Sequence, residues 1–561
     1  MTIRRSFLLV CLVLSVSIAF GVLVGPVTAQ RTKQQSKRGA TSRASAAFGY
    51  NVRVFGATGN GSTLDTPAID KTIDAAAAAG GGTVFFPAGS YLSVTIHLKS
   101  NVALYLDQGA TIVAATTGPG TQYDAPEPNQ WDQYQDFGHS HWRNSLIWGE
   151  NLDNVAILGP GKIWGKGLVK GGAASRSDAQ NQAIREVPAS GPFGYPNPRD
   201  AVEPGWGNKA IALKLCRNVI LKDFTIFHGG HFAILATGVD NLTIDNLKID
   251  TNRDGIDVDA CRNVRISNCT VNSPFDDAIC PKSSYALGFA RATENVTITN
   301  CQVSGYDEGT LLDGTFKREY KRYSNNSSTG RIKFGTESNG GFKNITISNC
   351  VFDYSRGLAL EAVDGALLED VTINNITMRD ITNAPIFIRL GNRARGPKET
   401  TKVGKLRRVI ISNVVIYNAD PRYGSIISGI PGHPIEDLRL SNVRIYSKGG
   451  GTKEQAALQP PEKEDTYPEP SMFGEIPAYG FFIRHVNGLR MDNVEVSYLN
   501  DDLRSAFWLH DVKGAEFFRV RAQRRSDVPT FLLKDIEDFS VVQSHPIADT
   551  RLDKIKEGRI E

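Results

Sequence analysis

The sequence has few of the features that mark a nucleic-acid-binding protein. Its formal charge is only +4, from 63 basic and 59 acidic residues. No block of Lys and Arg stands in the body of the chain, so nothing supplies the basic patch that a nucleic-acid backbone requires. We therefore expect no nucleic-acid partner.

Cysteine is also scarce, with seven in 561 residues. Cys11 lies in an apolar N-terminal run, which leaves six in the rest of the chain. Cys269, Cys301 and Cys350 occupy one slot of the repeat described below. An oxidising compartment permits disulfides, yet cysteine also packs as a small apolar side chain. We expect stacked free thiols rather than a disulfide framework.

A long apolar run occurs near the N-terminus, from Phe7 to about Val24, after two arginines. Small residues follow it and end at Ala29, which is typical of a secretory signal. We predict a signal peptide at 1–29 and a secreted or periplasmic protein without stable membrane association after cleavage. The alternative is an uncleaved, membrane-anchoring segment. Cys11 lies inside the run, which argues against a lipoprotein anchor.

The body of the chain repeats one strand-like pattern. Each copy reads Asn, aliphatic, any, aliphatic, any, Asn or Asp, apolar, any, apolar, and apolar–polar alternation is a strand signature. Copies include "NVILKDFTI" (218), "NLTIDNLKI" (241), "NVRISNCTV" (263), "NVTITNCQV" (295), "NITISNCVF" (344) and "DVTINNITM" (370). The closest copies start 22 or 23 residues apart, and wider gaps carry insertions.

This spacing predicts an all-β fold, a single-stranded right-handed parallel β-helix. A unit of about 22 residues is too short for a propeller blade, and no helix separates the strands. Coils stacked about 4.8 Å apart are the remaining solution. The Asn that recurs at one slot can form a side-chain ladder at a turn. Long interruptions at 116–146, 165–207 and 447–475 should project outward as walls of a groove.

The predicted organisation is a signal peptide (1–29), a flexible linker (30–48), the β-helix catalytic domain (49–546) and a charged C-terminal tail (547–561). A solenoid must cover its ends. The stretch "TLDTPAIDKTIDAAAAAGGG" predicts a short N-terminal capping helix, with Thr66 at the N-cap, followed by Pro67, and with Gly80 as the stop.

Several aspartates coincide when they are counted from the Asn of each copy. Asp254 is 241 + 13 and Asp276 is 263 + 13, with Asp277 beside it. The same count gives His231 one coil earlier and Glu308 one coil later. The expected column is therefore His231–Asp254–Asp276–Glu308. Carboxyls this close cannot all ionise freely, and a shared proton beside an ionised neighbour suits acid–base cleavage of a glycosidic bond.

Two other interpretations of these carboxyls stay open. Asp254, Asp276 and Asp277 could bind Ca²⁺, or they could be a solvated row of turn residues. Asp257 and Asp259 follow at alternate positions and are expected to be polar turn residues.

At these residues the sequence resembles the polygalacturonase family, glycoside hydrolase family 28. The family's N-T-D motif corresponds to "NRD" (252–254), and its D-D pair to "DD" (276–277) one coil later. The segments "NVRVFGATGNGSTLDTPAIDKTIDAAAAAGGG" and "APIFIRLGNRARGP" are also similar to the family. The resemblance covers roughly 49–450. It implies an inverting hydrolase without cofactor or metal, with Asp277 as general acid and Asp254 and Asp276 holding the water.

The sequence departs from the family at two motifs. The region of the G-H-G element reads "SSTGRIKFGTES" and contains no His. Where the R-I-K cations should stand, "GLALEAVDG" places Ala359 and Glu361. A carboxylate cannot replace an anion-binding cation, so the sugar beside the scissile bond is expected to be neutral, as in rhamnogalacturonan. Candidate substrate-binding residues are His231, Lys282, Arg331, Lys333 and Glu361.

Three functions follow. The main hypothesis is a secreted inverting glycoside hydrolase acting on α-glycosidic bonds of a pectic, acidic polysaccharide. The first alternative is a Ca²⁺-dependent polysaccharide lyase on the same fold, and the second is a non-catalytic carbohydrate-binding β-helix.

Overall fold

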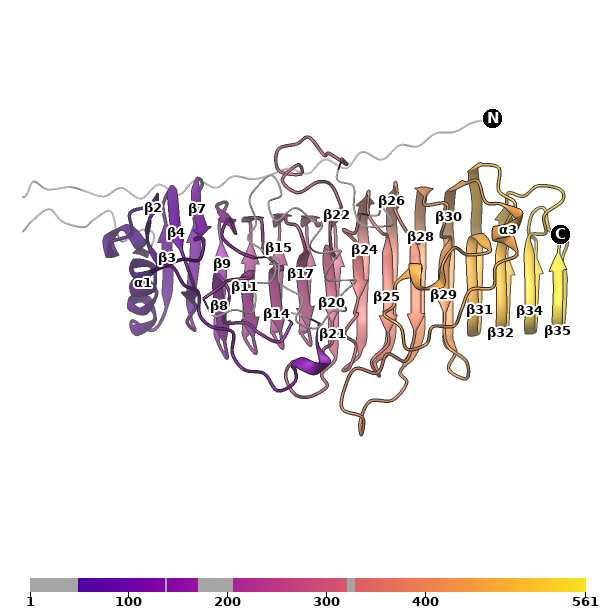
Figure 1. Cartoon of the computed structure of the whole chain (residues 1–561), viewed down its shortest axis with the longest axis horizontal. Coiled ribbons are helices and arrows are strands. Elements are labelled where there is room, and N and C mark those ends of the chain that lie inside the picture. The colour runs from indigo at the N-terminus through magenta and orange to yellow at the C-terminus, as the bar shows by residue number, and fades with distance from the viewer. Residues whose placement is uncertain (1–48, 137–138, 170–204, 320–327) are drawn as a thin grey trace, which may run out of the picture. The chain divides into compact units, whose positions relative to one another are not determined.

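The computed structural model describes residues 49–136, 139–169, 205–319 and 328–561. The expected signal peptide and linker lie outside these residues. The described residues belong to one compact unit in which the chain winds as a parallel β-helix (Figure 1). The predicted all-β solenoid is confirmed.

The coils stack to form three sheets, here called sheets 1, 2 and 3. Sheet 1 contains β5 (Ile96–His97), β8 (Ile147–Glu150), β11 (Lys209–Lys214), β14 (Phe232–Thr237), β17 (Asp254–Asp259), β20 (Ile279–Lys282), β23 (Ile332–Phe334), β25 (Leu358–Ala362), β27 (Ile386–Leu390) and β29 (Ser425–Ser428). It continues into the first parts of β31 (Ala478–Asn500), β32 (Ser505–Phe518) and β34 (Phe531–Val542).

Sheet 2 carries the Asn-led copies of the repeat. It contains β1 (Tyr50–Asn51), β3 (Gly82–Phe86), β6 (Val102–Leu106), β9 (Asp153–Leu158), β12 (Arg217–Lys222), β15 (Asp240–Asp245), β18 (Arg262–Ser267) and β21 (Thr293–Thr299), followed by β24 (Phe342–Asp353), β26 (Leu367–Arg379), β28 (Lys405–Ala419) and β30 (Ile435–Gly449).

Sheet 3 is short. It contains β2 (Asn60–Leu64), β4 (Gly89–Ser93), β7 (Ala110–Ala114), β10 (Lys162–Trp164), β13 (Thr225–Phe227), β16 (Lys248–Asp250), β19 (Thr270–Asn272) and β22 (Gln302–Ser304). From β24 onward one continuous strand serves both sheets 2 and 3, because β24 pairs with both β21 and β22.

Alternation within each strand builds the core. Across sheet 1, Ile256 lies in register with Ile279, and Ile279 with Ile332. All three are fully buried. Their outward-facing neighbours point to the opposite side of the sheet, because the side-chain period of a strand is two. Full burial of such an aliphatic side chain contributes roughly 1.5–3 kcal/mol, so the aliphatic stack fixes which residues face outward.

Asparagines form the predicted ladder beside sheet 2. The Nδ2 atom of each donates to the Oδ1 atom of the one before, from Asn241 to Asn218 (2.9 Å), from Asn263 to Asn241 (3.2 Å) and from Asn295 to Asn263 (3.1 Å). A second ladder runs through Asn349, Asn375, Asn413, Asn442 and Asn493. These asparagines have φ between 53° and 57°, a left-handed conformation that Asn tolerates better than most residues.

Both ends of the β-helix are covered, with two differences from the expectation. The capping helix α1 spans Thr66–Ala78, with Asp65 rather than Thr66 at its N-cap. The Thr66 hydroxyl instead contacts Ser93 Oγ, 2.8 Å away, on β4. The expected charged tail contains β35 (Thr550–Ile560), which pairs antiparallel with β34. Leu552, Ile555 and Ile560 pack against the core and let this charged segment add to the sheet as its last strand.

The remaining helices are short and lie in connections. They are the helical turn α3 (Lys453–Ala456) and the 3-10 turns η1 (Val52–Phe55), η2 (Asp132–Tyr134) and η4 (Pro470–Phe473). The last of the described elements is the two-residue strand β33 (Arg521–Ala522). Among the described residues no helix is long and apolar enough to cross a membrane.

The six described cysteines are free and buried, as the repeat predicts. Cys269, Cys301 and Cys350 each point a thiol at the carbonyl two residues earlier, at 3.2–3.3 Å. They act as core residues of stacked coils.

The Asn ladder leads to a stability prediction. Asn263→Ala removes two ladder hydrogen bonds and places Ala at φ 56°, so we expect a loss of about 1–2 kcal/mol in the free energy of unfolding. Asn263→Gly loses the same bonds without the backbone strain and should unfold at a higher temperature than the Ala variant. Thermal unfolding followed by circular dichroism measures both. Equal midpoints for the two variants would contradict the conformational explanation.

Candidate active site

The three predicted catalytic aspartates converge on sheet 1. Asp254 begins β17, and Asp276 and Asp277 form the turn before β20. The backbone N–H of Asp277 lies 3.2 Å from both Asp254 Oδ1 and Asp276 Oδ1. One oxygen from each carboxyl lies within 4.8 Å of the others. The sequence count therefore predicted correctly that these three carboxyls lie close together.

The register differs from the predicted column by one residue. Ile256 pairs with Ile279, so the neighbour of Asp254 in the next coil is Asp277 rather than Asp276. In the preceding coil Phe232, not His231, pairs with Asp254. Glu308 lies outside the column, with its carboxylate 3.2 Å from His228 Nδ1. The reason is local: sheet 3 keeps a 22-residue repeat here, whereas the turn leading into β20 adds one residue.

Two cations hold Asp277. Arg331 Nε lies 2.7 Å from its Oδ1, and Lys333 Nζ lies 3.1 Å from its Oδ2. All three side chains are almost completely buried. Burial alone would raise the pKa of Asp277, but Arg331 and Lys333 outweigh it and hold the pKa well below its usual range. Asp277 is therefore an anion at neutral pH.

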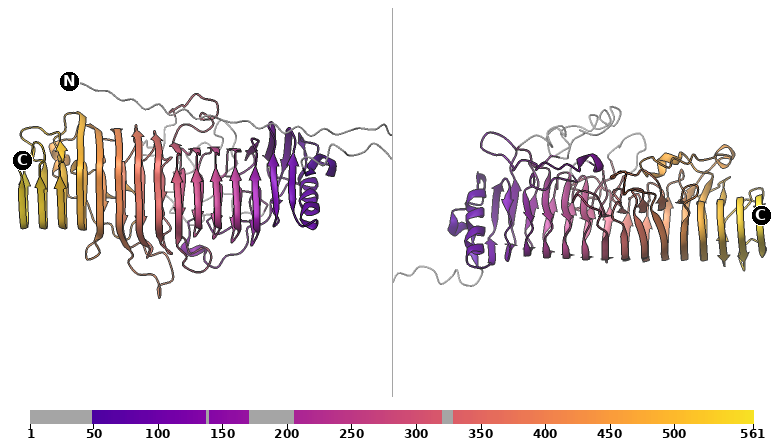
Figure 2. Two further views of the ribbon diagram at one scale, coloured as in Figure 1. Left: turned by 180° about the vertical axis from the view of Figure 1, so that it is seen from behind. Right: turned by 90° about the horizontal axis from the view of Figure 1, so that it is seen from below.

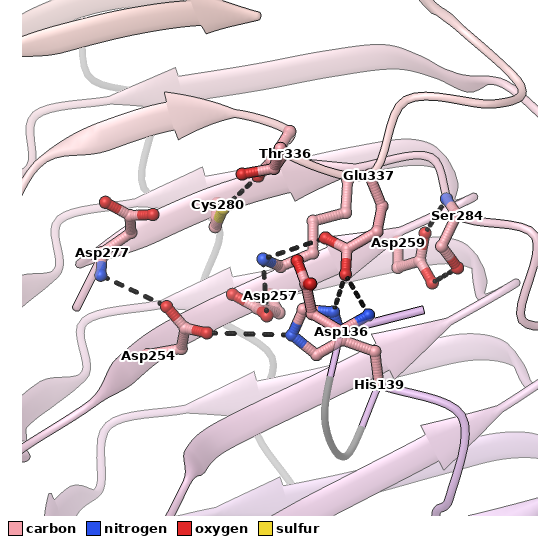
Figure 3. A network of polar contacts seen from close by, with 12 residues as sticks. Asp136, His139, Asp254, Asp257, Asp259, Asp277, Cys280, Ser284, Thr336 and Glu337 are labelled. Atoms are coloured by element: carbon pink, nitrogen blue, oxygen red, sulfur yellow. Dashed lines mark hydrogen bonds and ion pairs between the residues drawn. The ribbon is translucent and has the colours of Figure 1, made fainter. Parts of the chain in front are cut away.

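Asp254 is also held as an anion. It is buried, and His139 Nε2 lies 4.0 Å from its Oδ2 (Figure 3). Burial raises its pKa, but the positive charges of Lys282 and His139 outweigh burial and lower it. Gly255 permits the close packing of this strand, because a Cβ there would lie 2.4 Å from Val271 Cγ1 and 2.5 Å from the Ala278 carbonyl oxygen.

Asp276 differs from the other two. Its side chain is 25% exposed and forms an ion pair with Arg253 Nη2. Burial in the cleft and the charge of Asp254 raise its pKa to about 6, against the opposing effect of Arg253. Of the three carboxyls, Asp276 is the one that can carry a proton near neutral pH.

The five predicted substrate-binding residues are all buried beside these carboxyls. Arg331 and Lys333 bind Asp277, and Lys282 Nζ lies 3.6 Å from Asp257 and 3.7 Å from Glu337. Glu361 is fully buried, 3.9 Å from Lys333. His231 lies with its ring centroid 6.5 Å from that of His139. Their expected contact with substrate stays a prediction, and their positions favour an effect on the carboxyls.

Asp257 and Asp259 are not the turn residues that the sequence suggested. Both lie in β17 and are buried. Asp259 accepts hydrogen bonds from the Ser284 backbone N–H (2.7 Å) and hydroxyl (2.6 Å). Burial and the charge of Asp254 raise the pKa of Asp257 well above its usual range. They face outward on sheet 1 because they alternate with Ile256 and Val258, which the core requires.

Sequence reasoning missed residues that the long insertions deliver. His139 and Asp136 come from the 116–146 insertion, and Tyr467 and Glu469 from the 447–475 insertion. Glu469 Oε1 lies 2.6 Å from Arg331 Nη2, and the Tyr467 hydroxyl lies 3.3 Å from Lys333 Nζ. The only signal in the sequence was the polar and aromatic character of these insertions, because a repeat cannot place residues outside it.

The two insertions cover sheet 1 on both sides of the carboxyls. Trp142 packs on outward-facing residues of the earlier coils, Ala212, Phe232 and Leu235. Phe473 and Ile476 cover an outward-facing apolar row on the later coils, which runs through Phe387, Ile426, Phe482 and Trp508. In the right panel of Figure 2, loops gather along one side of the coil stack.

Side chains that could share a cation do occur here. His139, His231 and Asp254 form one such group, Asp136, His139 and Glu337 a second, and the three predicted catalytic aspartates a third. Lys282, Arg331 and Lys333 already supply positive charge to these carboxylates, so we assign no metal. The expected absence of metal and cofactor stays a prediction.

The raised pKa of the buried Glu361 carboxyl leads to a prediction about how stability depends on pH. Burial raises the pKa of Glu361 to about 7, so the folded state keeps its proton when the unfolded chain, with an ordinary pKa near 4.5, has lost it. Wild-type stability should therefore fall between about pH 4.5 and pH 7. Glu361→Gln cannot ionise, so its stability relative to wild type should rise over that range by about 3 kcal/mol. Denaturant unfolding at pH 4.5 and 7.5 measures this, and a constant difference would contradict it.

Comparison with known proteins agrees with the fold. A family profile described as "Rhamnogalacturonase A/epimerase, pectate lyase-like" matches residues 49–151, and one described as "Right handed beta helix region" matches 202–311. The predicted handedness is thereby confirmed.

Among curated proteins, a "Probable polygalacturonase" of Vitis vinifera is 22% identical over 410 residues, covering 70% of this chain and 73% of that protein. An exo-poly-alpha-D-galacturonosidase of Dickeya chrysanthemi is 24% identical over 373 residues, 61% of this chain and 56% of its own length. A shorter segment is 48% identical over 69 residues to a mannuronan C5-epimerase of Azotobacter vinelandii, 12% of this chain and 4% of that protein.

Among solved structures, the family 28 exopolygalacturonase of Yersinia enterocolitica superimposes with a TM-score of 0.59 at 19% identity. The match covers 83% of this chain and 78% of that one.

Proposed function

We propose that this chain, a divergent member of the polygalacturonase-like family (glycoside hydrolase family 28), is a secreted hydrolase that cleaves α-glycosidic bonds in a pectic polysaccharide. One observation carries the proposal: three adjacent carboxyls are held in different protonation states. Asp254 and Asp277 are anionic, while Asp276 can keep a proton to about pH 6. An acid beside a base is what glycosidic hydrolysis requires.

The electrostatics favour Asp276 as the general acid, in place of Asp277, which the resemblance suggested. A proton donor needs a raised pKa, and the Arg331–Lys333 pair keeps the proton off Asp277. Asp276 is also the only one of the three whose side chain is appreciably exposed to an incoming sugar.

The reaction then balances as follows. Asp276 gives its proton to the glycosidic oxygen as the bond to the anomeric carbon breaks. A water held between Asp254 and Asp277 attacks that carbon and gives up a proton to one of these carboxylates. Return of that proton through solvent to Asp276 completes the cycle.

Inversion is the outcome that the resemblance implies. The oxygens of the three carboxyls approach within 4.8 Å, which is closer than the roughly 6.5–9.5 Å usual for an inverting pair. A spacing this short would also suit a nucleophilic carboxylate, so the anomeric configuration of the first product is the deciding measurement.

The charges favour a neutral sugar beside the scissile bond. Arg331 is bound by Asp277 and Glu469, and Lys333 by Asp277 with Glu361 beneath it. A uronate carboxylate would have to compete with these internal carboxylates for the same cations. This supports a rhamnogalacturonan-type substrate over homogalacturonan.

The covered sheet favours attack near chain ends. A polysaccharide running along sheet 1 would meet Trp142 on one side of the carboxyls and Phe473 on the other. A long chain therefore has no straight course past the site over the described residues, whereas a chain end can enter between the two insertions.

The acid assignment can be tested with leaving groups. Asp276→Asn should abolish hydrolysis of the polysaccharide but keep cleavage of an aryl glycoside of the same sugar, because a good leaving group needs no proton. Asp277→Asn should lose both activities, because the water is no longer held. Each loss should be about 10²–10⁴-fold in kcat.

Asp492→Asn, an exposed carboxyl on a later coil, serves as the matched control and should leave both rates unchanged. If Asp277→Asn were the variant rescued by the aryl leaving group, Asp277 would be the acid and our assignment would be wrong.

Substrate and mode of attack can be read from one product screen. Incubated with homogalacturonan and with rhamnogalacturonan, the protein should release reducing sugar mainly from the latter. Products should be short from the first minutes, with little early fall in viscosity. Proton NMR of the first product should show the anomeric configuration opposite to that of the substrate.

Other outcomes separate the alternatives. Products that absorb in the ultraviolet and disappear with a chelator indicate a lyase. Release from neither polymer supports a non-catalytic carbohydrate-binding β-helix. Faster release from homogalacturonan would contradict the neutral-sugar argument alone.

A further inference from the structure

We propose that His139 is a positioning residue of the active site, and that the Glu337–His139 pair holds Asp254 as the carboxylate that activates water. This inference deepens the proposed function and rests on it. It gives the 116–146 insertion a task in catalysis. The repeat pattern of the sequence predicts no such task for this segment.

His139 is fixed from two sides. Its Nδ1 lies 2.5 Å from Glu337 Oε1, and its ring lies 4.7 Å from that of Phe232 between centroids. Phe232 is the residue in register with Asp254 one coil earlier. The ring therefore lies over the position next to Asp254, and its Nε2 faces Asp254 Oδ2 (Figure 3).

The insertion is itself anchored at this point. The Asp136 backbone N–H donates to Glu337 Oε1 at 3.0 Å, and the Asp136 carboxylate accepts from Arg395 Nη1 at 2.7 Å. Arg395 lies in the connection after β27, seven coils from the β8 end of the insertion. Segments far apart in the chain thus meet to place one imidazole.

The two carboxylates that face the ring favour its doubly protonated form. Glu337 lies at Nδ1 and Asp254 at Nε2, and a proton on each nitrogen puts positive charge toward both. At 4.0 Å the contact with Asp254 is an ion pair rather than a hydrogen bond. An imidazolium in this place adds positive charge to the side of Asp254 away from Asp277.

The groups that surround the ring come from every neighbouring element. The negative charges are Asp254 on β17, Glu337 after β23 and Asp136 on the insertion, and Asp257 on β17 lies among them with a pKa raised by burial and by the charge of Asp254. Positive charges are Lys282 on β20 and Arg395 after β27. Burial lowers the pKa of His139, but the Glu337 charge outweighs it and raises the pKa to about 9.

The consequence concerns which carboxyl keeps the proton. Asp254, Asp276 and Asp277 repel one another when ionised. Arg331 and Lys333 keep Asp277 as an anion, whereas Asp254 depends on the positive charges of Lys282 and His139. With the imidazolium present, Asp254 ionises and the proton remains on Asp276. Without it, Asp254 competes for that proton and both acid and base are lost in part.

A histidine is absent from the segment that corresponds to the G-H-G element, and the structure places one from another segment beside it. The stretch "SSTGRIKFGTES" contains no His, but its Glu337 holds one that comes from a different segment. The insertion thereby becomes part of the active site.

His139→Gln is the direct test, with His141→Gln as the matched control. His141 lies on the same insertion but contacts Asp132 and the Glu127 carbonyl oxygen instead of the catalytic carboxyls. In His139→Gln the acidic limb of the kcat profile should move to higher pH by about one unit, because loss of a nearby cation raises the pKa of Asp254. kcat should fall about tenfold or more, with KM little changed, and His141→Gln should match wild type.

A second measurement does not depend on activity. With ¹⁵N-labelled histidine, the His139 resonances should show an imidazolium at pH 7.5, and Asp254→Asn should lower its titration midpoint by about one unit, since the coupling is reciprocal. Glu337→Gln should also lower the titration midpoint of His139. This variant keeps the inference testable if His139→Gln does not fold.

The outcomes are distinguishable. A neutral His139 at pH 7.5, or a midpoint unmoved by Asp254→Asn, overturns the inference whatever the activity. A folded His139→Gln with lower kcat but an unmoved pH profile shows a merely structural role and also overturns it. Wild-type protein without hydrolase activity refutes the proposed function, while the titration still decides the charge of His139.

Discussion

Parallel stacking of coils in register is the constraint on which this protein depends. Backbone hydrogen bonds hold each coil about 4.8 Å from the next, so whatever faces outward at one position faces its equivalent in the neighbouring coil. At most positions this stacks Ile on Ile or Asn on Asn and adds stability. At the start of β17 and just before β20 it brings Asp254 beside Asp277, where the same geometry costs free energy.

Buried cations offset the repulsion between these carboxylates, and most of these cations contact more than one carboxylate. Asp277 has Arg331 and Lys333, and Glu337 and Asp257 have Lys282. Glu469 balances the excess positive charge on the far side, and Glu361 adds negative charge there only as it ionises near pH 7. Burying paired charges stabilises a fold poorly, whereas leaving one partner unpaired is strongly destabilising. The network is better understood as a device that fixes protonation states than as a source of stability.

The insertions convert this network into an enclosed site. They contribute little to the coil core, yet they deliver His139, Glu469 and Tyr467 to the carboxyls and cover sheet 1 on both sides. Two tasks, setting the charges of the carboxyls and covering the sheet around them, thus fall to the same two segments. Under the proposed function, changes in these loops would alter specificity and pH dependence together.

The sequence by itself determined the β-helix, the Asn ladders, the free cysteines and the identity of Asp254, Asp276 and Asp277, because all of these follow from a short repeat that local alternation encodes. Only the tertiary structure decided which aspartate faces which, since one extra residue in the turn before β20 shifts the pairing to Asp277. It also decided that Asp257 and Asp259 are buried and that Lys282, Arg331, Lys333 and Glu361 lie beneath the carboxyls. His139 could not be placed from sequence at all, because its position depends on contacts with Glu337 and Phe232 that no repeat spacing records.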